Sequence, residues 1–382
     1  MIDEHVNELL LSCLRVRYDS QALRQTRQLA NVNGLDWDAF FQHALAESVA
    51  PLVHHTLSNH PGILPPSVEQ ALGVAYYHAA ARNALLFEEL AGIVEILNEA
   101  SVPVILLKGA ALAQGVYENV AFRPMSDLDL LVPGTLIAHA EKCLVENEYV
   151  LLGVGHSFAR HSTASAGTGW PPVELHRHIV SSPYYRKKIP EHWLWRDPVE
   201  TSINGVPALR LSWTAAVIHS CMHFLDHIAA RSPLLWLCDI SELLRREEAD
   251  WDALCGAVSD FGVALPVTSV LETCSEALGL SLPEHFARTV QAMSPGLVER
   301  TAYQFCLSGT RSTASKTLFD FLTVEGLANK ARLLSSRLFP SRDYMIRRYS
   351  IRRRWLVPLY YPRMLGAAAV QGIRALRRPY GQ

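Results

Sequence analysis

The seven cysteines of this 382-residue chain are an odd number, they are scattered, and no two of them form a C-x-x-C pair. The pattern therefore lacks the regular spacing of a disulfide framework and the paired cysteines of a zinc ribbon. The first ten residues, MIDEHVNELL, are acidic where a secretion signal has a basic run, so we expect no export signal. The sequence thus predicts reduced, mostly buried thiols in a cytoplasmic protein.

Long uninterrupted apolar runs are also missing. The most apolar stretch near the C-terminus, 355–376, is broken by Pro358, Pro362, Arg363 and Arg374, so we expect no transmembrane segment. Internal repeats and low-complexity tracts are absent too. Hydrophobic residues nevertheless make up 49% of the chain and aromatic residues 9%. That share excludes general disorder, and the length predicts two or three structural units.

The net charge of −2 is small but unevenly distributed. Residues 330–382 hold 13 Lys or Arg and one acid, whereas the rest of the chain holds 22 basic and 36 acidic residues. A basic tail of this kind suits RNA, a membrane surface or an acidic partner. Trp355 and Tyr360 can pack, which favours docking of the tail onto the chain's own acidic body. Arg352-Arg353-Arg354 has no interleaved aromatic motif, so nucleic acid is not the partner we favour.

Hydrophobic periodicity divides the chain into four regions. Apolar residues recur at helical spacing before residue 101 and again after residue 212, whereas the segment between them alternates short aliphatic runs with helices. Expected strands cover 102–107, 127–132, 149–154 and 172–176, and the expected helices around them include 110–117, 135–146, 213–226, 234–246 and 251–261. The sequence thus predicts an α+β protein. Its regions are an N-terminal helical region 1–100, an α/β core 101–210, a C-terminal helical domain 211–329 and a basic tail 330–382.

Asp127 and Asp129 stand two residues apart on the second expected strand. Side chains alternate along a strand, so both carboxylates point to one face. Converging carboxylates suit a pair of Mg²⁺ ions, which prefer oxygen ligands and keep waters and substrate phosphates as further ligands. Glu174 on a later strand is the candidate third carboxylate, and His176 shares its face. A D-x-D pair alone is not specific, so its context matters.

That context is a turn rich in phosphate-binding features. Lys108-Gly109 lies where a strand meets a helix, so backbone N–H groups and the helix dipole can receive phosphate oxygens. Gly109 allows a close approach, and Lys108 supplies a positive charge. Arg123 precedes Asp127 by four residues and can add a second cation for a leaving pyrophosphate.

The stretch VILLKGAALAQGVYENVAFRPMSDLDLLV, followed by Glu174-Leu175-His176, resembles the nucleotidyltransferase superfamily of the DNA polymerase β-like kind. Within it the chain is similar to the bacterial family of uncharacterised nucleotidyltransferases, whose KGxAL turn, RPMxDhDLLV strand and ELH motif are all present. The resemblance covers most of residues 30–260. At one position the chain departs from the superfamily, because Ala110 stands where the turn often carries serine or glycine. The resemblance implies a polymerase β-like core and the following nucleotide contacts: Lys108, Gly109, Ala110, Arg123 and Ser126.

The resemblance also implies an activity: transfer of a nucleoside monophosphate from an NTP, with ATP as the expected donor, and release of pyrophosphate. Asp127, Asp129 and Glu174 would bind two Mg²⁺ ions, and Glu174 could instead act as base. Family members often lie beside genes for peptide natural products or surface polysaccharides, so the acceptor would be a small molecule, a sugar or a peptide. Two alternatives remain: an abortive-infection-type toxin that modifies tRNA or protein, and a non-catalytic nucleotide-binding module.

A second group of polar residues lies in the C-terminal helical domain. His219 and His223 are four apart on one expected helix, and Asp239 follows on the next. This spacing is compatible with zinc, but residues 220–222 are Ser, Cys and Met and give no HEXXH support. The remaining interpretations are a wall of the substrate cleft, together with His176, or buried structural histidines.

Overall fold

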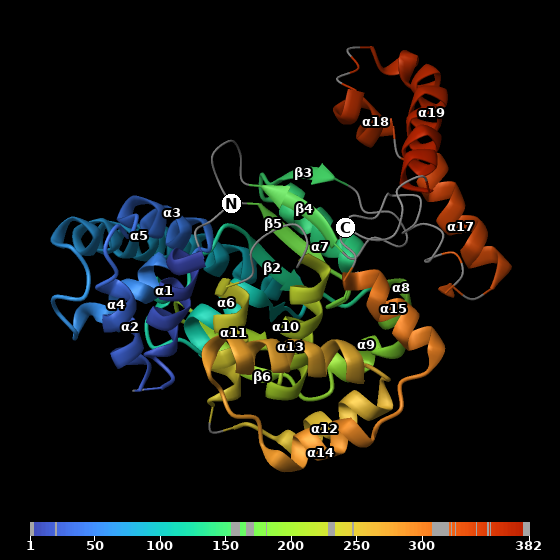
Figure 1. Ribbon diagram of the computed structural model, residues 1–382. Helices are drawn as coiled ribbons and strands as arrows, with labels where there is room; N and C mark the ends of the chain where they lie inside the picture. The colour runs from blue at the N-terminus through green and yellow to red at the C-terminus, as the bar shows by residue number, and fades with distance from the viewer. Residues whose placement is uncertain are drawn as a thin grey trace.

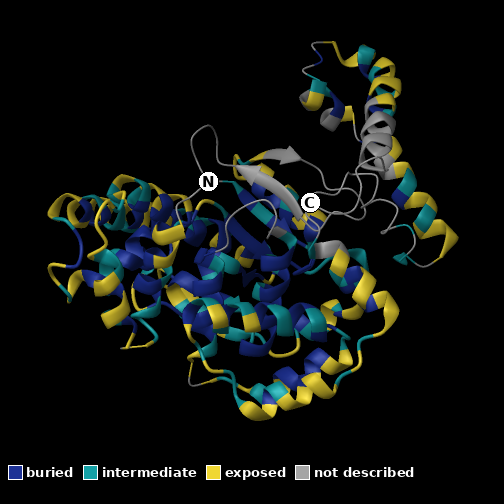
Figure 2. Cartoon of the chain, viewed as in Figure 1, coloured by how far each residue is buried: buried dark blue, intermediate teal, exposed yellow. Residues whose placement is uncertain are grey.

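The computed structural model places helices before and after a central sheet (Figure 1). The residues described are 4–19, 21–153, 161–165, 172–180, 182–227, 234–246, 248–307, 321, 323–324, 326–340, 342–349, 351 and 353–376. Helices and a mixed sheet within one chain confirm the α+β class. Figure 2 shows that buried residues gather around the sheet and on the inner faces of the helices.

Five helices precede the sheet: α1 (Glu4–Arg15), α2 (Ala22–Ala30), α3 (Trp37–Ala46), α4 (Ala50–Ser58) and α5 (Pro66–Glu99). The 34-residue α5 begins at a proline, which is tolerated in the first turn because the N–H that it lacks has no intrahelical partner there. Its N-terminal part packs with α1 to α4 through Leu72. Its C-terminal part packs on the sheet through Leu90 and Leu97. This helix therefore connects the N-terminal helices to the sheet.

The sheet has seven strands in the order β3-β4-β5-β2-β1-β7-β6. Their bounds are β1 (Ile105–Leu106), β2 (Leu128–Leu131), β3 (Val150–Gly153), β4 (His161–Ser165), β5 (Val173–His176), β6 (Val199–Ile203) and β7 (Val206–Arg210). The elements between them are α6 (Lys108–Gly115), η1 (Val120–Phe122), α7 (Ile137–Glu146), α8 (Pro183–Lys188) and α9 (Glu191–Leu194). Strand β2 lies at the centre, parallel to β5 and antiparallel to β1.

Strands β4, β6 and β7 are additions to the four strands that the sequence predicts. The β6–β7 hairpin turns at Asn204-Gly205, and both residues have positive φ. An Asn-Gly pair between two short alternating runs favours such a two-residue turn, so this hairpin carries a recognisable local signal. Strand β7 then pairs in parallel with β1 and extends the sheet on that side.

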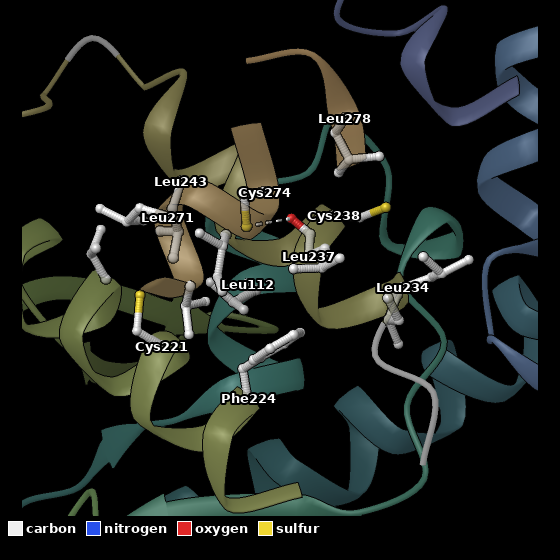
Figure 3. Close-up of a cluster of buried hydrophobic side chains, with 14 of the residues drawn as sticks. Leu112, Cys221, Phe224, Leu234, Leu237, Cys238, Leu243, Leu271, Cys274 and Leu278 are labelled. Atoms are coloured by element: carbon white, nitrogen blue, oxygen red, sulfur yellow. Dashed lines mark hydrogen bonds between the residues drawn. The ribbon is translucent and has the colours of Figure 1, made fainter. Parts of the chain in front are cut away.

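Helices α10 to α15 follow the sheet: α10 (Trp213–His227), α11 (Leu234–Leu244), α12 (Trp251–Asp260), α13 (Ala264–Leu278), α14 (Glu284–Ala292) and α15 (Leu297–Leu307). Figure 3 shows Leu112 of α6 among side chains of α10, α11 and α13, such as Phe224, Leu237 and Leu271. The same hydrophobic cluster includes Val6 of α1. The N-terminal helices, α6 and the C-terminal helices thus share one core.

The basic region forms α17 (Leu327–Leu338), α18 (Arg342–Tyr349), η2 (Arg354–Leu356) and α19 (Val357–Leu376). Met345, Ile351, Val357 and Met364 make a small core of their own. Figure 1 shows α18 and α19 extending away from the body. Among the residues described, no helix is both long enough and apolar enough to cross a membrane.

Candidate active site

The first structural feature of the site is the pairing of two neighbouring parallel strands. Asp129 on β2 lies directly opposite Glu174 on β5 in the sheet register. Leu128 and Leu130 point to the opposite face and are buried in the cluster beneath the sheet. The alternation that predicts carboxylates on one face of β2 is therefore present for Asp129. Asp127 lies immediately before the strand, which begins at Leu128.

Three side chains converge at Asp129. Its Oδ1 accepts hydrogen bonds from Lys108 Nζ at 2.7 Å and from His176 Nε2 at 2.5 Å. His176 is fully buried, and its Nε2 is also 3.5 Å from Glu174 Oε2. The carboxylate of Asp129 is 2% exposed, whereas that of Glu174 is 22% exposed. The buried ring of His176 therefore contacts both carboxylates through its Nε2. Of the two acids, Glu174 is the more exposed to solvent.

The two aspartates experience different electrostatic surroundings. Burial alone would raise the pKa of Asp129, but the charge of Lys108 and the hydrogen bonds from His176 and Lys108 outweigh it, so this pKa lies well below its ordinary range. The pKa of Asp127 is raised, first by burial and then by the neighbouring charge of Asp129. Ser126, at the surface, donates a 3.3 Å hydrogen bond to Asp127 Oδ1. The pair thus consists of one firmly ionised carboxylate and one that is more easily protonated.

The donor set fits a hard divalent cation. One ligand atom from each of Asp129, Glu174 and His176 lies within 4.8 Å of the other two. In the part of the chain that the structure describes, these three residues make the one such cluster of His, Cys, Asp or Glu. Carboxylate oxygens at this separation suit Mg²⁺ or Mn²⁺. Asp127 adjoins the cluster and senses the charge of Asp129.

The turn between β1 and α6 lies beside these carboxylates. Lys108 has a φ of +46°, a left-handed conformation that is rare outside glycine. This conformation starts α6 one residue after Leu107, whose N–H donates to the backbone oxygen of Asp129 at 3.0 Å. Gly109 and Ala110 follow in the buried first turn. The predicted strand–turn–helix is therefore present, with the ammonium of Lys108 directed at Asp129.

The structure places Arg123 away from the open side of the site. Its guanidinium forms a buried ion pair with Asp239 of α11, with Nη2 3.0 Å from Oδ2. Tyr117 Oη also donates to Asp239, at 2.9 Å. Since the exposed fractions of Arg123 and Asp239 are 6% and 3%, the geometry favours an internal role for Arg123 over the predicted phosphate contact. Of the interpretations left open for Asp239, it favours an internal one over a place in the wall of the substrate cleft.

The two helical histidines do not join the carboxylates. His219 is buried, and its Nδ1 lies 2.9 Å from the backbone oxygen of Ile179. The ring of His223 packs edge-on against Trp236 with a centroid distance of 4.9 Å. Neither histidine belongs to a metal-type cluster within the described ranges. These contacts favour a structural role for both.

Two further residues shape the site, and the sequence analysis missed both. Asn83 of α5 donates to the backbone oxygens of Val120 and Arg123 and accepts from the N–H of Met125. Tyr117 holds Asp239, as described above. A polar residue within an apolar helix is a weak sign of such a role for Asn83. For Tyr117 the only local sign is its place in the stretch KGAALAQGVY, which follows the first strand.

Comparison with known proteins identifies a family for this chain. The family model for "uncharacterised nucleotidyltransferase" matches residues 33–279. No curated protein matches the chain significantly. Two solved structures are similar: the antibiotic-resistance factor ANT(2'')-Ia (14% identity, 50% of this chain, 98% of the other, TM-score 0.34) and a nucleotidyltransferase-like protein from Paracoccidioides brasiliensis (13% identity, 55% and 94%, TM-score 0.35). Because the family model spans more than half of its length, the chain belongs to the uncharacterised nucleotidyltransferase family.

Proposed function

We propose that this nucleotidyltransferase moves a nucleoside monophosphate from ATP to a hydroxyl of a small molecule, a sugar or a peptide natural product, with release of pyrophosphate. The observation that carries the proposal is the convergence of Asp129, Glu174 and His176 beside the Lys108 turn. Neighbouring carboxylates repel one another, and a bound divalent cation turns that arrangement into a favourable one, which supports a catalytic site over a non-catalytic nucleotide-binding module.

In this proposal Asp127, Asp129 and Glu174 hold two Mg²⁺ ions. When bound, such ions neutralise the triphosphate and lower the pKa of the acceptor hydroxyl. His176 fixes the orientation of the Asp129 carboxylate through its Nε2. With Oδ1 held by this hydrogen bond, the side chain cannot rotate freely, and Oδ2 keeps one direction. The more open Glu174 is placed to complete a ligand set or to take the proton of the acceptor hydroxyl.

The nucleotide phosphates are proposed to lie over the turn at Lys108. The first turn of α6 offers backbone N–H groups and the positive end of the helix dipole through Gly109 and Ala110. The ammonium of Lys108, 2.7 Å from Asp129, is the positive charge that would contact a phosphate oxygen. Ser126 is exposed beside Asp127 and can contribute its hydroxyl. Arg123 leaves this group because its charge is paired with Asp239.

The test uses ATP labelled at one of two phosphates, so that the fate of each phosphate can be followed. The protein is incubated with Mg²⁺, a panel of sugar and peptide acceptors, and ATP labelled at either the α- or the γ-phosphate. We expect the α label in the product and the γ label in pyrophosphate. Asp129→Asn should abolish the transfer, while the exposed Asp38→Asn serves as a matched control with the same chemical change. Transfer of the γ label, or full activity of Asp129→Asn, would contradict the proposal.

A further inference from the structure

Arg123 and Asp239 form a buried ion pair whose position is not explained by binding of substrate. The guanidinium contacts both oxygens of Asp239, with Nε 3.3 Å from each and Nη2 3.0 Å from Oδ2. Tyr117 adds a third donor from the same connecting segment, 117–123. Removing two charges from water costs free energy that their mutual attraction often does not recover, so a buried ion pair is better explained by the geometry that it imposes than by a gain in stability. The question is therefore which geometry this pair maintains.

The remaining nitrogen of the guanidinium, Nη1, lies against the turn at Lys108-Gly109, called the catalytic turn below. A Cβ at Gly109 would collide with Nη1 of Arg123 and lie 3.0 Å from Cγ of Met125. Nη1 also donates to the backbone oxygen of Pro124 at 3.2 Å. The guanidinium is thus wedged between the turn at Gly109 and the segment that enters β2. Gly109 is explained by this close approach without any contact to a phosphate.

The segment from Val120 to Met125 is held on its opposite side by α5. Asn83 donates to the backbone oxygens of Val120 at 2.6 Å and Arg123 at 2.9 Å. Arg82 donates to the backbone oxygen of Met125 at 3.1 Å. The chain reaches Asp127 two residues later, before β2 begins. Asp127 is outside the ladder of the sheet, so its place is fixed by this clamped segment on one side and by Leu128, whose N–H donates to the backbone oxygen of Pro172 at 3.0 Å, on the other.

We propose that Asp239 and Arg123 are a positioning pair, through which helix α11 fixes the Gly109 turn and the Asp127 carboxylate in the geometry that binds the metal. This inference rests on the proposed function, because it assigns a purpose to the same carboxylates. Neither residue touches the nucleotide. Asp239 acts through Arg123, and Arg123 acts through the two backbone segments that it separates.

The chain offers a matched control on the same helix. One turn after Asp239, Glu242 accepts from Arg17 Nε at 2.5 Å and from Tyr18 Oη at 3.1 Å. The side chains of Arg17 and Glu242 are 8% and 7% exposed. Both carboxylates of α11 thus hold one arginine and one tyrosine in a buried setting. Arg17 also contacts the connecting segment, 3.7 Å from Glu118 and over the ring of Phe122. Only the Asp239 pair reaches Gly109, so the control separates contact with the segment from contact with the turn.

The experiment compares two double variants, Arg123→Met with Asp239→Leu and Arg17→Met with Glu242→Leu. Each replaces a buried ion pair by apolar side chains of similar size, a change that proteins can accommodate. Mn²⁺ binding is measured by electron paramagnetic resonance, without nucleotide and with the uncleavable α,β-methylene-ATP. We expect the first variant to bind Mn²⁺ about 10–100-fold more weakly, as loss of an outer-shell partner does. The second should bind within about twofold of wild type, on the same outer-shell reasoning.

Several outcomes would overturn the positioning role. The first is wild-type Mn²⁺ affinity in a folded Arg123/Asp239 variant. The second is intact Mn²⁺ binding combined with loss of α,β-methylene-ATP binding. That second result would make Arg123 a phosphate contact. If that variant does not fold, Tyr117→Phe is compared with Tyr18→Phe. Weaker Mn²⁺ binding in the first alone supports the proposal, and equal binding overturns it. Failure of the proposed function is distinct, because then Asp129→Asn would retain wild-type Mn²⁺ affinity.

Discussion

Asp127 and Asp129 are chemically identical, yet their surroundings predict opposite effects on stability when either becomes asparagine. Asp129→Asn leaves the ammonium of Lys108 without its buried partner, which should destabilise the fold by about 1–3 kcal/mol. Asp127→Asn removes a carboxylate whose ionisation is disfavoured by burial and by Asp129. Its unfolding temperature without added metal should equal or exceed that of wild type.

Thermal unfolding in a chelator checks this contrast, because both variants keep the size of the side chain. The two unfolding temperatures are compared with that of Asp38→Asn, which lies at the surface. A lower stability for Asp127→Asn than for Asp129→Asn would contradict the electrostatic assignment of the two residues.

For single residues, the local sequence pattern predicted where the carboxylates lie. It did not predict which acid pairs with which basic side chain. The period of two along β2 and β5 was enough to place Asp129, Glu174 and His176 on one face. Arg123 also stands close to Asp127 in sequence, which suggested a phosphate contact. Its partner, Asp239, is 116 residues further along the chain. No spacing rule connects such distant residues, because their contact depends on how α11 packs against α6.

Among the elements, the β6–β7 hairpin depends most clearly on one backbone conformation. Gly205 has a φ of +86°, with nothing within 4 Å of the position that a Cβ would take. Gly205→Ala should therefore destabilise the protein by roughly 1 kcal/mol through backbone strain alone. Gly256 in α12 is the control, since it also has open space but lies in a helix. Gly256→Ala should be neutral or stabilise by up to about 1 kcal/mol.

Urea unfolding of the two alanine variants measures this difference. A Gly205→Ala variant as stable as Gly256→Ala would show that the turn at Asn204-Gly205 adopts another conformation in solution. Because β7 pairs with β1 on the side that the Val104 oxygen faces, the destabilised variant should also show faster amide exchange at Leu106, whose N–H faces the same side. That exchange provides a second readout at the strand preceding the catalytic turn.

Elements were predictable where one local signal dominated. The long apolar periodicity of α5 and the strand at Leu128 follow directly from the sequence. The first strand was expected over 102–107 but comprises only Ile105 and Leu106. Its aliphatic residues are buried all the same, since burial depends on packing and not on the length of the ladder. Apolar composition therefore predicts burial better than it predicts hydrogen-bonded pairing.

Across the whole molecule, the N-terminal and C-terminal helices are joined by one core. The largest hydrophobic cluster extends from Val6 in α1 to Ala302 in α15. Arg15 Nε donates to the backbone oxygen of Ala277 at 2.7 Å, and Arg17 pairs with Glu242. We therefore expect the two helical regions to unfold together in one transition.

The check compares far-UV circular dichroism with tryptophan fluorescence during thermal unfolding. Trp37 lies in the N-terminal helices, whereas the other tryptophans packed in the same core lie after the sheet strand β5: Trp193, Trp195, Trp213, Trp236 and Trp251. The exposed Trp355 of the tail is replaced by phenylalanine so that its signal does not mix with that of the body. Coincident midpoints are expected. Two separated transitions would show that residues 1–100 form an independent domain, as their sequence periodicity alone suggests.

The parallel pairing of β2 with β5, with β7 completing the other side of β1, has a consequence for synthesis of the chain on the ribosome. Asp127 and Asp129 emerge early, but Glu174 and His176 follow nearly fifty residues later, and Asp239 later still. A nascent chain therefore displays its aspartates and Lys108 well before Glu174, His176 and Asp239 exist, and non-local pairing of this kind forms slowly. The enzyme should remain inert towards nucleotide until most of its body has been translated.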